Sequence, residues 1–268
     1  MAVIETEGLS KFYGSRRGIE GVTLTVEQGE VFGFLGPNGA GKTTTIRTLL
    51  DLLHPSAGSA SLFGLDSRRE SVAIRARLGN LPGDFGYGGK ASGREALALL
   101  ARLRGNDGLG RAEQLAERFH ADLERPLSEL SRGNRQKVGL ILALFHSPEL
   151  LILDEPTSGL DPLMQEEFLT LVREERERGC TVFISSHELD EVERVCDRVG
   201  IIRDGRLIAV ERVADLLAKA AERRRVEVEF AEPVELDDVR ALPGVAAAEY
   251  ARPSLEEVFL TYYGKEDA

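Results

Sequence analysis

A glycine-rich loop between a buried strand and a helix constrains this chain more than any other segment. Residues 36–43 read Gly-Pro-Asn-Gly-Ala-Gly-Lys-Thr, which fits the pattern G-x-x-x-x-G-K-[ST]. The continuous apolar run at residues 31–35 precedes the loop, as in a strand buried within a parallel sheet. Apolar residues then recur at helical spacing from Ile46 to Leu53. This order of strand, loop and helix predicts an α/β fold with a phosphate site.

The residues of the loop suit the phosphate groups of a nucleotide. Its glycines let successive backbone N–H groups curl around phosphate oxygens, and the following helix adds its N-terminal dipole. We expect Lys42 to bridge the β- and γ-phosphates and Thr43 to hold Mg²⁺. A plain strand-to-helix turn is the alternative, and the matching context argues against it. The predicted phosphate-binding residues are Gly36, Pro37, Asn38, Gly39, Ala40, Gly41, Lys42, Thr43 and Thr44.

A second buried strand ends in two carboxylates. Residues 150–155 read Leu-Leu-Ile-Leu-Asp-Glu, so Asp154 lies at the carboxyl end of the strand, where ligands bind in open α/β sheets. We expect Asp154 to orient Mg²⁺ through water and Glu155 to act as general base on the attacking water. Two solvated acids at a strand end are the alternative, which the phosphate loop makes the weaker interpretation.

The rest of the chain alternates strands and helices, with one helical interruption. Residues 181–184 read as another buried strand, and residues 200–210 carry a hairpin pattern around Asp-Gly. Strand signals vanish over about residues 84–148, where residues 94–104 and 111–120 read as amphipathic helices. We therefore predict a parallel sheet covered by helices, with a helical subdomain inserted into it.

Residues 224–268 are predicted to form a small C-terminal α+β extension. Residues 225–230 alternate like a strand, and residues 254–263 look like a capped helix. The segment carries 11 acidic and 5 basic side chains, so it holds much of the formal net charge of −11. Such acidity argues against nucleic acid as a partner, because non-specific binding needs a basic surface that displaces counterions.

The chain shows no sign of secretion or membrane insertion. Its two cysteines, Cys180 and Cys196, form no metal motif and suit a reducing cytosol. Residues 1–10 lack the basic start and apolar stretch of a signal peptide. Apolar runs such as residues 138–145 fall well short of the about 20 residues that a membrane span needs. We expect a cytoplasmic protein that would serve a membrane only through a partner.

Three segments together resemble those of ABC ATPases, in the usual order of that family. They are the phosphate loop, residues 130–134 (Leu-Ser-Arg-Gly-Asn), and the strand that continues into Asp-Glu-Pro-Thr-Ser-Gly-Leu-Asp at residues 154–161. The resemblance covers roughly residues 3–215. It implies a P-loop NTPase (RecA-like) core with an antiparallel β subdomain and the inserted helical subdomain, within an ATPase domain at residues 1–223. It also implies ATP and Mg²⁺ as cofactors, and ATP hydrolysis as the activity.

The resemblance assigns further residues to the site. Ser131 and Gly133, in the family's signature motif, would contact the γ-phosphate held by a second subunit, and Asp161 would connect the two sites. Ser131 and Asp161 also read as plain helix N-caps, and both roles can hold. By the resemblance, His187 is the switch histidine beside the γ-phosphate and Tyr13 stacks on adenine. Without it, His187 reads as structural and Tyr13 as a core residue.

The chain departs from the family's pattern at two places. Arg132 and Asn134 replace the third and fifth residues of the usual Leu-Ser-Gly-Gly-Gln motif, and we expect Arg132 to face solvent. The glutamine that the family places after a strand falls on Gly83, with Asp84 or water as its substitute. Residues 82–84, Pro-Gly-Asp, favour a left-handed turn at Gly83 over the simple loss of a ligand.

Residues 253–260 are similar to the tail of ATPases from ABC-2-type exporters. We therefore expect the ATP-hydrolysing subunit of an ABC exporter, which forms a head-to-tail dimer with a second copy of itself. It would couple to a separate membrane-spanning permease and lie peripherally on the inner face of the cell membrane. An importer subunit is one alternative. The other is a soluble ABC ATPase acting on nucleic acid or the ribosome, which usually carries two ATPase units or a long coiled-coil insertion.

Overall fold

The chain divides into two units, Met1–Ala221 and Glu222–Ala268. The computed structural model describes residues 1–85, 90–105, 108–221, 234–245 and 248. Within the second unit it describes one short helix, α9 (Leu236–Arg240). The strand predicted at 225–230, the helix predicted at 254–263 and the exporter-like stretch 253–260 lie outside the described residues. The proposed boundary between residues 223 and 224 stays a prediction.

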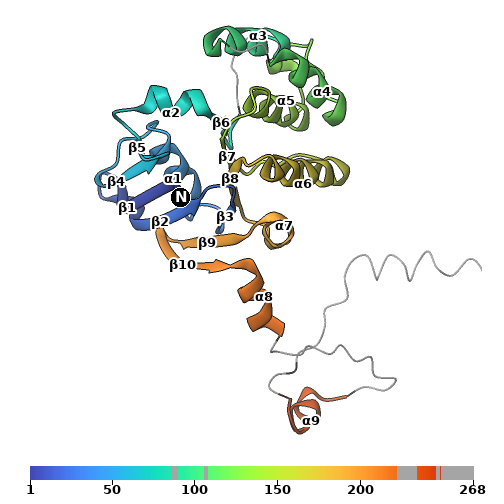
Figure 1. Cartoon of the computed structure of the whole chain (residues 1–268). Coiled ribbons are helices and arrows are strands. Elements are labelled where there is room, and N and C mark those ends of the chain that lie inside the picture. Colours follow the sequence, from blue (N-terminus) through green and yellow to red (C-terminus); the bar gives the residue numbers. More distant parts are fainter. Residues whose placement is uncertain (86–89, 106–107, 222–233, 246–247, 249–268) are drawn as a thin grey trace, which may run out of the picture. The chain divides into compact units, whose positions relative to one another are not determined.

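A six-stranded sheet forms the centre of the first unit, in the order β10-β9-β3-β8-β7-β6 (Figure 1). All neighbours are parallel except β9 and β10, which form the predicted hairpin. Every residue of β7 and β8 is buried, which is why both strands appear in the sequence as continuous apolar runs. The strands are β3 (Val31–Leu35), β6 (Leu78–Leu81), β7 (Leu150–Asp154), β8 (Thr181–Ser186), β9 (Arg198–Arg203) and β10 (Arg206–Arg212).

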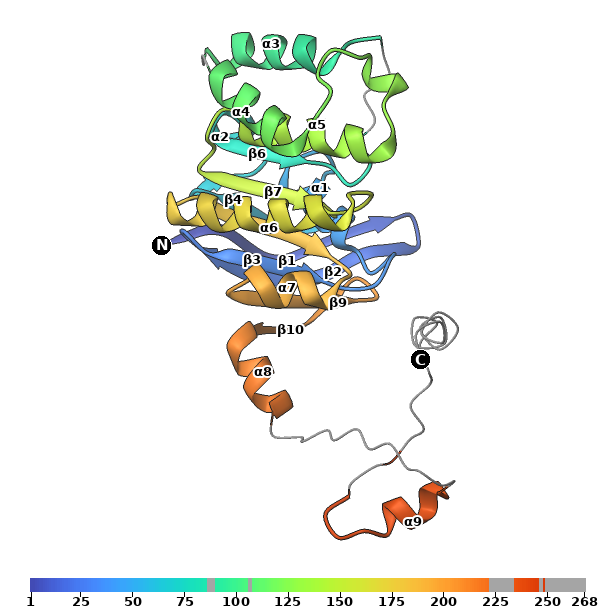
Figure 2. The same cartoon turned by 90° about the vertical axis from the view of Figure 1, so that its right-hand side faces the viewer.

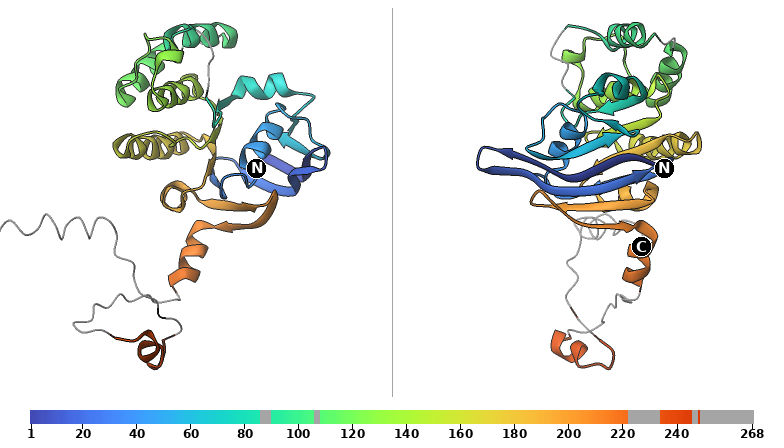
Figure 3. Two further views of the ribbon diagram at one scale, coloured as in Figure 1. Left: turned by 180° about the vertical axis from the view of Figure 1, so that it is seen from behind. Right: turned by 60° about the vertical axis from the view of Figure 1, so that its left-hand side comes forward.

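A second, antiparallel sheet of four strands confirms the β subdomain that the resemblance implies. Its order is β2-β1-β4-β5, and the long hairpin of β1 and β2 stands out in Figure 3. Buried side chains of this sheet, such as Leu9 and Val22, share one core with Phe32 and Phe34 of the main sheet. The strands are β1 (Ala2–Tyr13), β2 (Arg16–Glu27), β4 (Ala57–Leu62) and β5 (Leu65–Asp66).

Helices cover both faces of the main sheet. Helix α1 (Lys42–Leu49) lies on the side of the antiparallel sheet, whereas α6 (Pro162–Glu177) and α7 (Leu189–Val195) cover the other side (Figures 1 and 2). Helix α1 is shorter than its apolar pattern, because Asp51 turns the backbone to a φ of 54°. Two further helices of this unit are α2 (Ser71–Arg77) and α8 (Val213–Ala221).

The predicted helical subdomain is inserted between β6 and β7 (Figure 2). It contains α3 (Gly93–Arg104), α4 (Leu109–Phe119), the 3₁₀ turn η1 (Leu127–Glu129) and α5 (Arg132–Leu144). The buried faces of these helices pack together, as amphipathic helices require. Arg111 and Arg118 of α4 form ion pairs with glutamates of α6, which tie the subdomain to the sheet. Within the described part of the chain, no helix has the length and apolar character to span a bilayer.

Candidate functional site

A cleft of about 720 Å³ opens where the phosphate loop meets the ends of β6 and β7. Most of the predicted site residues line it. They are Tyr13 from β1, the loop residues Pro37, Asn38, Gly39, Gly41, Lys42, Thr43 and Thr44, and Asp154 and Glu155 at the end of β7. Gly36 and Ala40 belong to the same loop but do not line the cleft, and Ala40 is buried beneath it.

The backbone of the loop requires glycine at several positions. Gly39 and Gly41 have φ angles of 82° and 112°, which L-amino acids with side chains rarely adopt. A Cβ atom at Gly36 would lie 2.4 Å from the carbonyl oxygen of Ile202, so no side chain fits there. The loop therefore holds a tight curve that ends at the first turn of α1.

The Lys42 side chain is buried inside this curve. Its Nζ donates hydrogen bonds to the carbonyl oxygens of Gly36, at 2.6 Å, and Pro37, at 3.3 Å. The same Nζ lies 2.9 Å from Oε1 of Glu155. The ammonium group is thus held at the centre of the loop, where it faces the end of β7.

Asp154 and Thr43 meet at the floor of the cleft. The Thr43 hydroxyl donates a hydrogen bond of 2.7 Å to Oδ2 of Asp154, whose side chain is almost fully buried. The other carboxylate oxygen accepts a hydrogen bond from the Ser185 hydroxyl of β8. Ser185 is a site residue that sequence reasoning missed, because nothing in its own segment points to Asp154. A hydroxyl and a carboxylate side by side offer the hard oxygen donors that Mg²⁺ prefers.

Glu155 is held in an unusual backbone conformation. Its φ of 51° is positive, which costs a non-glycine residue about 1–3 kcal/mol. Its backbone N–H donates to both the carbonyl and the hydroxyl oxygen of Ser185, at 3.1 Å each. From α5, the buried Gln136 amide donates to the carbonyl oxygens of Glu155 and Pro156. Gln136, two residues before the apolar run 138–145, was also missed from the sequence.

The Glu155 side chain connects the cleft with His187. Its Oε2 lies 2.5 Å from Nδ1 of His187, which follows β8 and is partly exposed. The two predicted catalytic side chains are therefore in direct contact, although His187 itself does not line the cleft.

Tyr13 is not a core residue, so that interpretation of the sequence is wrong. The side chain is 47% exposed and lines the cleft. Its ring packs closely over Gly18, where a Cβ atom would lie 2.8 Å from Cε2. A half-exposed aromatic face at the rim of the cleft is available for stacking against a planar ligand.

Three arginines that the sequence did not single out also line the cleft. Arg16 and Arg17 come from the start of β2, and Arg47 comes from α1. They add local positive charge to a chain whose net charge is −11. Such a rim attracts anionic ligands and raises their association rate.

Ser131 and Asp161 are helix N-caps, as predicted. The Ser131 hydroxyl accepts a hydrogen bond from the Asn134 N–H at the start of α5, and Asp161 caps α6 through the Met164 N–H. Neither residue lines the cleft, and neither does Gly133. The residues predicted to serve a second subunit are thus separated from the phosphate loop of their own chain.

The start of α5 packs tightly against the loop that follows Glu155. A Cβ atom at Gly133 would lie 2.6 Å from the carbonyl oxygen of Gly159. The exposed Arg132 side chain extends along Gly159 and donates a hydrogen bond of 2.6 Å to the Ser158 hydroxyl. Arg132 is exposed to solvent, as expected, and its guanidinium group also joins the two segments through this hydrogen bond.

The left-handed turn predicted at Gly83 is also wrong. The φ of Gly83 is not positive, so its backbone is one that other residues can adopt. Glycine is needed there for a different reason, since a Cβ atom would lie 2.9 Å from Oδ2 of Asp154. Gly83 and the exposed Asp84 both line the cleft beside Asp154.

Comparisons with known proteins agree with this geometry. The family model described as ABC transporter matches residues 19–158. The bacitracin transport ATP-binding protein BcrA of Bacillus licheniformis is 39% identical over 209 residues, which cover 77% of this chain and 68% of that protein. The daunorubicin resistance ATP-binding protein DrrA3 of Streptomyces coeruleorubidus is 38% identical over 244 residues, which cover 89% of this chain and 77% of that protein. A solved structure of the ATP-binding subunit of an ABC transporter superposes with a TM-score of 0.75 at 30% identity. The superposition covers 82% of this chain and 93% of that one.

Proposed function

This chain belongs to the ABC transporter family, and on that premise we propose that it is the ATP-hydrolysing motor subunit of an exporter. The observation that carries the proposal is the convergence of Lys42, Thr43, Asp154 and Glu155 in one cleft. The relatives named for bacitracin transport and daunorubicin resistance favour export over import. The formal net charge of −11 argues against the rival function on nucleic acid or the ribosome.

Within this function, Thr43 and Asp154 would hold Mg²⁺. Bound there, Mg²⁺ would neutralise charge on the β- and γ-phosphate oxygens of ATP. Among the described residues, no group of three or more His, Cys, Asp or Glu side chains could hold a metal by itself. The remaining ligands would therefore be phosphate oxygens and water, as is usual for Mg²⁺ bound with a nucleotide.

The side chains around Glu155 suit the hydrolysis of ATP. Lys42 would bind the β- and γ-phosphates, and Tyr13 would stack on the adenine. Glu155 would accept a proton from the attacking water while His187 orients the water and the γ-phosphate. A bond would form between the water oxygen and the γ-phosphorus, and the bond to the bridging oxygen would break, which releases ADP and phosphate.

A second copy would complete each site. A solved bacterial ABC transporter cassette of similar fold is dimeric, and Ser131, Gly133 and Asp161 do not line the cleft of their own chain. We infer that they act on the nucleotide held by a partner copy in a head-to-tail dimer. The amide groups at the start of α5 would then meet the γ-phosphate, as helix N-termini commonly bind anions.

The dimer would act on a separate permease. We assign residues 1–223 to the ATPase domain and residues 224–268 to an extension of unassigned role. The protein would lie in the cytoplasm, against the inner face of the cell membrane, through contact with the permease. Cargo would be selected by the permease, because no part of the proposed mechanism requires this chain to touch it.

Complementation between two inactive variants tests the proposal. Lys42→Ala removes the phosphate lysine, and Ser131→Ala removes the cap of the signature helix. Each variant alone should hydrolyse little ATP. In a mixed head-to-tail dimer, one site combines the intact Lys42 of one chain with the intact Ser131 of the other. Mixing should therefore restore part of the wild-type activity, whereas no recovery would refute the composite site. A wild-type chain without Mg²⁺-dependent ATPase activity would refute the function itself.

A further inference from the structure

We propose that Glu191 is a positioning residue for ATP hydrolysis, which anchors the turn that carries His187. The proposal rests on the ATPase function given above. Glu191 does not line the cleft and would not touch the reacting atoms. Glu191 would act through Ser186, which directly precedes His187. Glu191 also lies beside Thr157.

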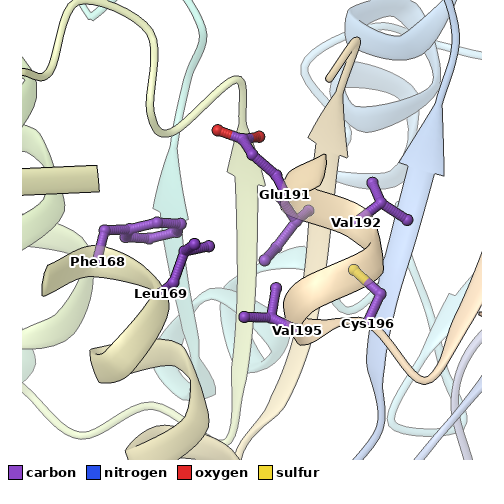
Figure 4. Close-up of a pocket in the computed structure, with 7 residues that line it drawn as sticks. Phe168, Leu169, Glu191, Val192, Val195 and Cys196 are labelled. Carbon is purple, nitrogen blue, oxygen red and sulfur yellow. The ribbon is translucent and has the colours of Figure 1, made fainter. Parts of the chain in front are cut away.

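Glu191 is a buried acid in an apolar setting. It lies in α7 and is only 9% exposed. Figure 4 shows Phe168 and Leu169 of α6 facing Val195 of α7, with the Glu191 carboxyl group directed away from Val195 and Cys196. The space among these described side chains is too small for a water molecule. Oε1 of the carboxyl group has no hydrogen-bond partner among the described residues, so Oε2 makes the bond that compensates for burial.

Ser186 supplies the main hydrogen bond. Its hydroxyl donates to Oε2 of Glu191 at 2.6 Å, and the same hydroxyl oxygen accepts from the Glu188 N–H at 2.9 Å. The carbonyl oxygen of Ser186 accepts from the N–H of Gly36, the first residue of the phosphate loop. His187 lies between Ser186 and Glu188, so these bonds hold the turn on both sides of the histidine.

The loop that follows Glu155 reaches the same carboxyl group. The buried Thr157 hydroxyl lies beside Glu191, two residues after the proposed general base. Burial raises the pKa of Glu191, while the Ser186 and Thr157 hydroxyls act in the opposite direction. Glu191 thus stands between the segment of His187 and the segment of Glu155, the two side chains that meet at 2.5 Å.

A purely structural role for Glu191 is the alternative. A leucine would fill the same space with a smaller loss of folding free energy. Burying a carboxyl group among apolar side chains is unfavourable unless hydrogen bonds compensate for the lost hydration. Here the compensating bond runs to a residue next to the proposed catalytic pair. A displacement of about 1 Å in such groups costs on the order of 10²-fold in rate. A positioning role therefore predicts a loss in kcat, whereas a structural role predicts a loss in stability.

The test compares Glu191→Leu and Glu191→Gln with Glu193→Leu as the control. Glu193 is an exposed acid on the same helix. Steady-state hydrolysis of Mg²⁺-ATP, ATP affinity and melting temperature are measured for each protein. Glu191→Leu should lower kcat by about 10²-fold with little change in KM or ATP affinity. Glu191→Gln should keep most of the activity, because its amide oxygen can accept the Ser186 bond. The control should match the wild type.

A second variant, Ser186→Ala, tests the same bond in case Glu191→Leu does not fold. Ser186→Ala removes the donor and leaves the backbone bond to Gly36 in place, so kcat should fall in the same way. Combining Ser186→Ala with Glu191→Gln should add little to that loss, since both act through one bond. Wild-type kcat in Ser186→Ala, or equal losses in the leucine and glutamine variants, would overturn the positioning role. A wild type that does not hydrolyse ATP would instead refute the proposed function.

Discussion

The ammonium group of Lys42 lies 2.9 Å from Oε1 of Glu155. The proposed phosphate ligand and the proposed general base are thus paired with each other, while Oε2 of the same carboxylate contacts His187. An anionic phosphate that binds Lys42 would compete with Glu155 for the same cation. Phosphate binding would therefore leave the carboxylate oxygen free to accept a proton from water.

Lys42→Ala should lose nearly all binding of ATP. The variant removes the cation that would bond to both the β- and the γ-phosphate, and each hydrogen bond to a charged group contributes about 1.5–3 kcal/mol. The loss in affinity should be about 10²-fold or more, measured by equilibrium binding of labelled ATP. Lys90→Ala, at an exposed position, is the control. Near wild-type affinity in Lys42→Ala would exclude the loop as the phosphate site.

Glu155→Gln should bind ATP but hydrolyse it slowly. The change keeps the shape of the side chain and removes the base, which is worth roughly 10²–10⁴-fold in rate. Because hydrolysis no longer releases the nucleotide, a stable dimer should form in ATP and be visible by gel filtration. Full ATPase activity would remove Glu155 as the base. A variant that stays monomeric in ATP would contradict the composite-site proposal.

Gly83→Ala should weaken the affinity for Mg²⁺ without destabilising the fold. The added Cβ atom would lie 2.9 Å from Oδ2 of Asp154, so the carboxylate that contacts Thr43 has to shift. The Mg²⁺ concentration for half-maximal ATPase activity should rise, while the melting temperature changes little. Gly83→Gln should act in the same direction, so it should not restore a working glutamine.

Gly110→Ala is the matched control for that experiment. Gly110 lies in α4, its φ is not positive, and an added Cβ atom would meet nothing within 4 Å. If the two alanine variants showed the same Mg²⁺ dependence, the close approach of Gly83 to Asp154 would have no functional role.

His146 should make the fold sensitive to acid. Burial, and then the nearby charge of Arg104, lower the pKa of His146 from 6.5 to about 4. Between these values the unfolded chain binds a proton that the folded chain does not, so stability falls as the pH falls. The neutral His146 ring lowers no stability above pH 6.5. By pH 4, its lowered pKa has reduced the free energy of unfolding by about 3 kcal/mol.

His146→Gln tests this dependence. The glutamine amide can still donate to the carbonyl oxygen of Leu78, which accepts a hydrogen bond from the histidine ring, but the amide does not titrate. Urea denaturation at pH 7 and near pH 4 should show a smaller loss of stability in the variant. Parallel losses in the two proteins would show that other groups dominate the acid response.

The buried strands β3, β7 and β8 and the hairpin of β9 and β10 were predicted from the sequence, whereas β1 and β4 were not. Strand β7 is a continuous apolar run because both of its faces are covered. Strand β1 lacks a regular alternation, since its register shifts between Thr6 and Leu9, around Gly8 with its positive φ. Strand β4 reads Ala-Gly-Ser-Ala-Ser-Leu, and these residues, apart from the last, have no strong preference for strands.

Site residues were expected from the sequence only where a motif or the family resemblance marks their own segment. Lys42, Thr43 and Asp154 carry their chemistry in their own segments. Ser185 and Gln136 instead act on residues from other elements, so their contacts exist only once the sheet and α5 have packed. Gly83 was misread for the same reason: its role depends on the distance to Asp154 and not on its own φ angle.

The contact between Gly133 and Gly159 limits how this surface can evolve. A methyl group at Gly133 would collide with the Gly159 backbone, and a φ of 83° keeps side chains from Gly159 as well. A side chain at either position would disturb this contact, so both positions require glycine. Arg132 is exposed and lies alongside this contact, so it can change without separating the backbones. If this surface contacts a second copy, substitutions at Arg132 are therefore the ones that can alter that contact with the least damage to the fold.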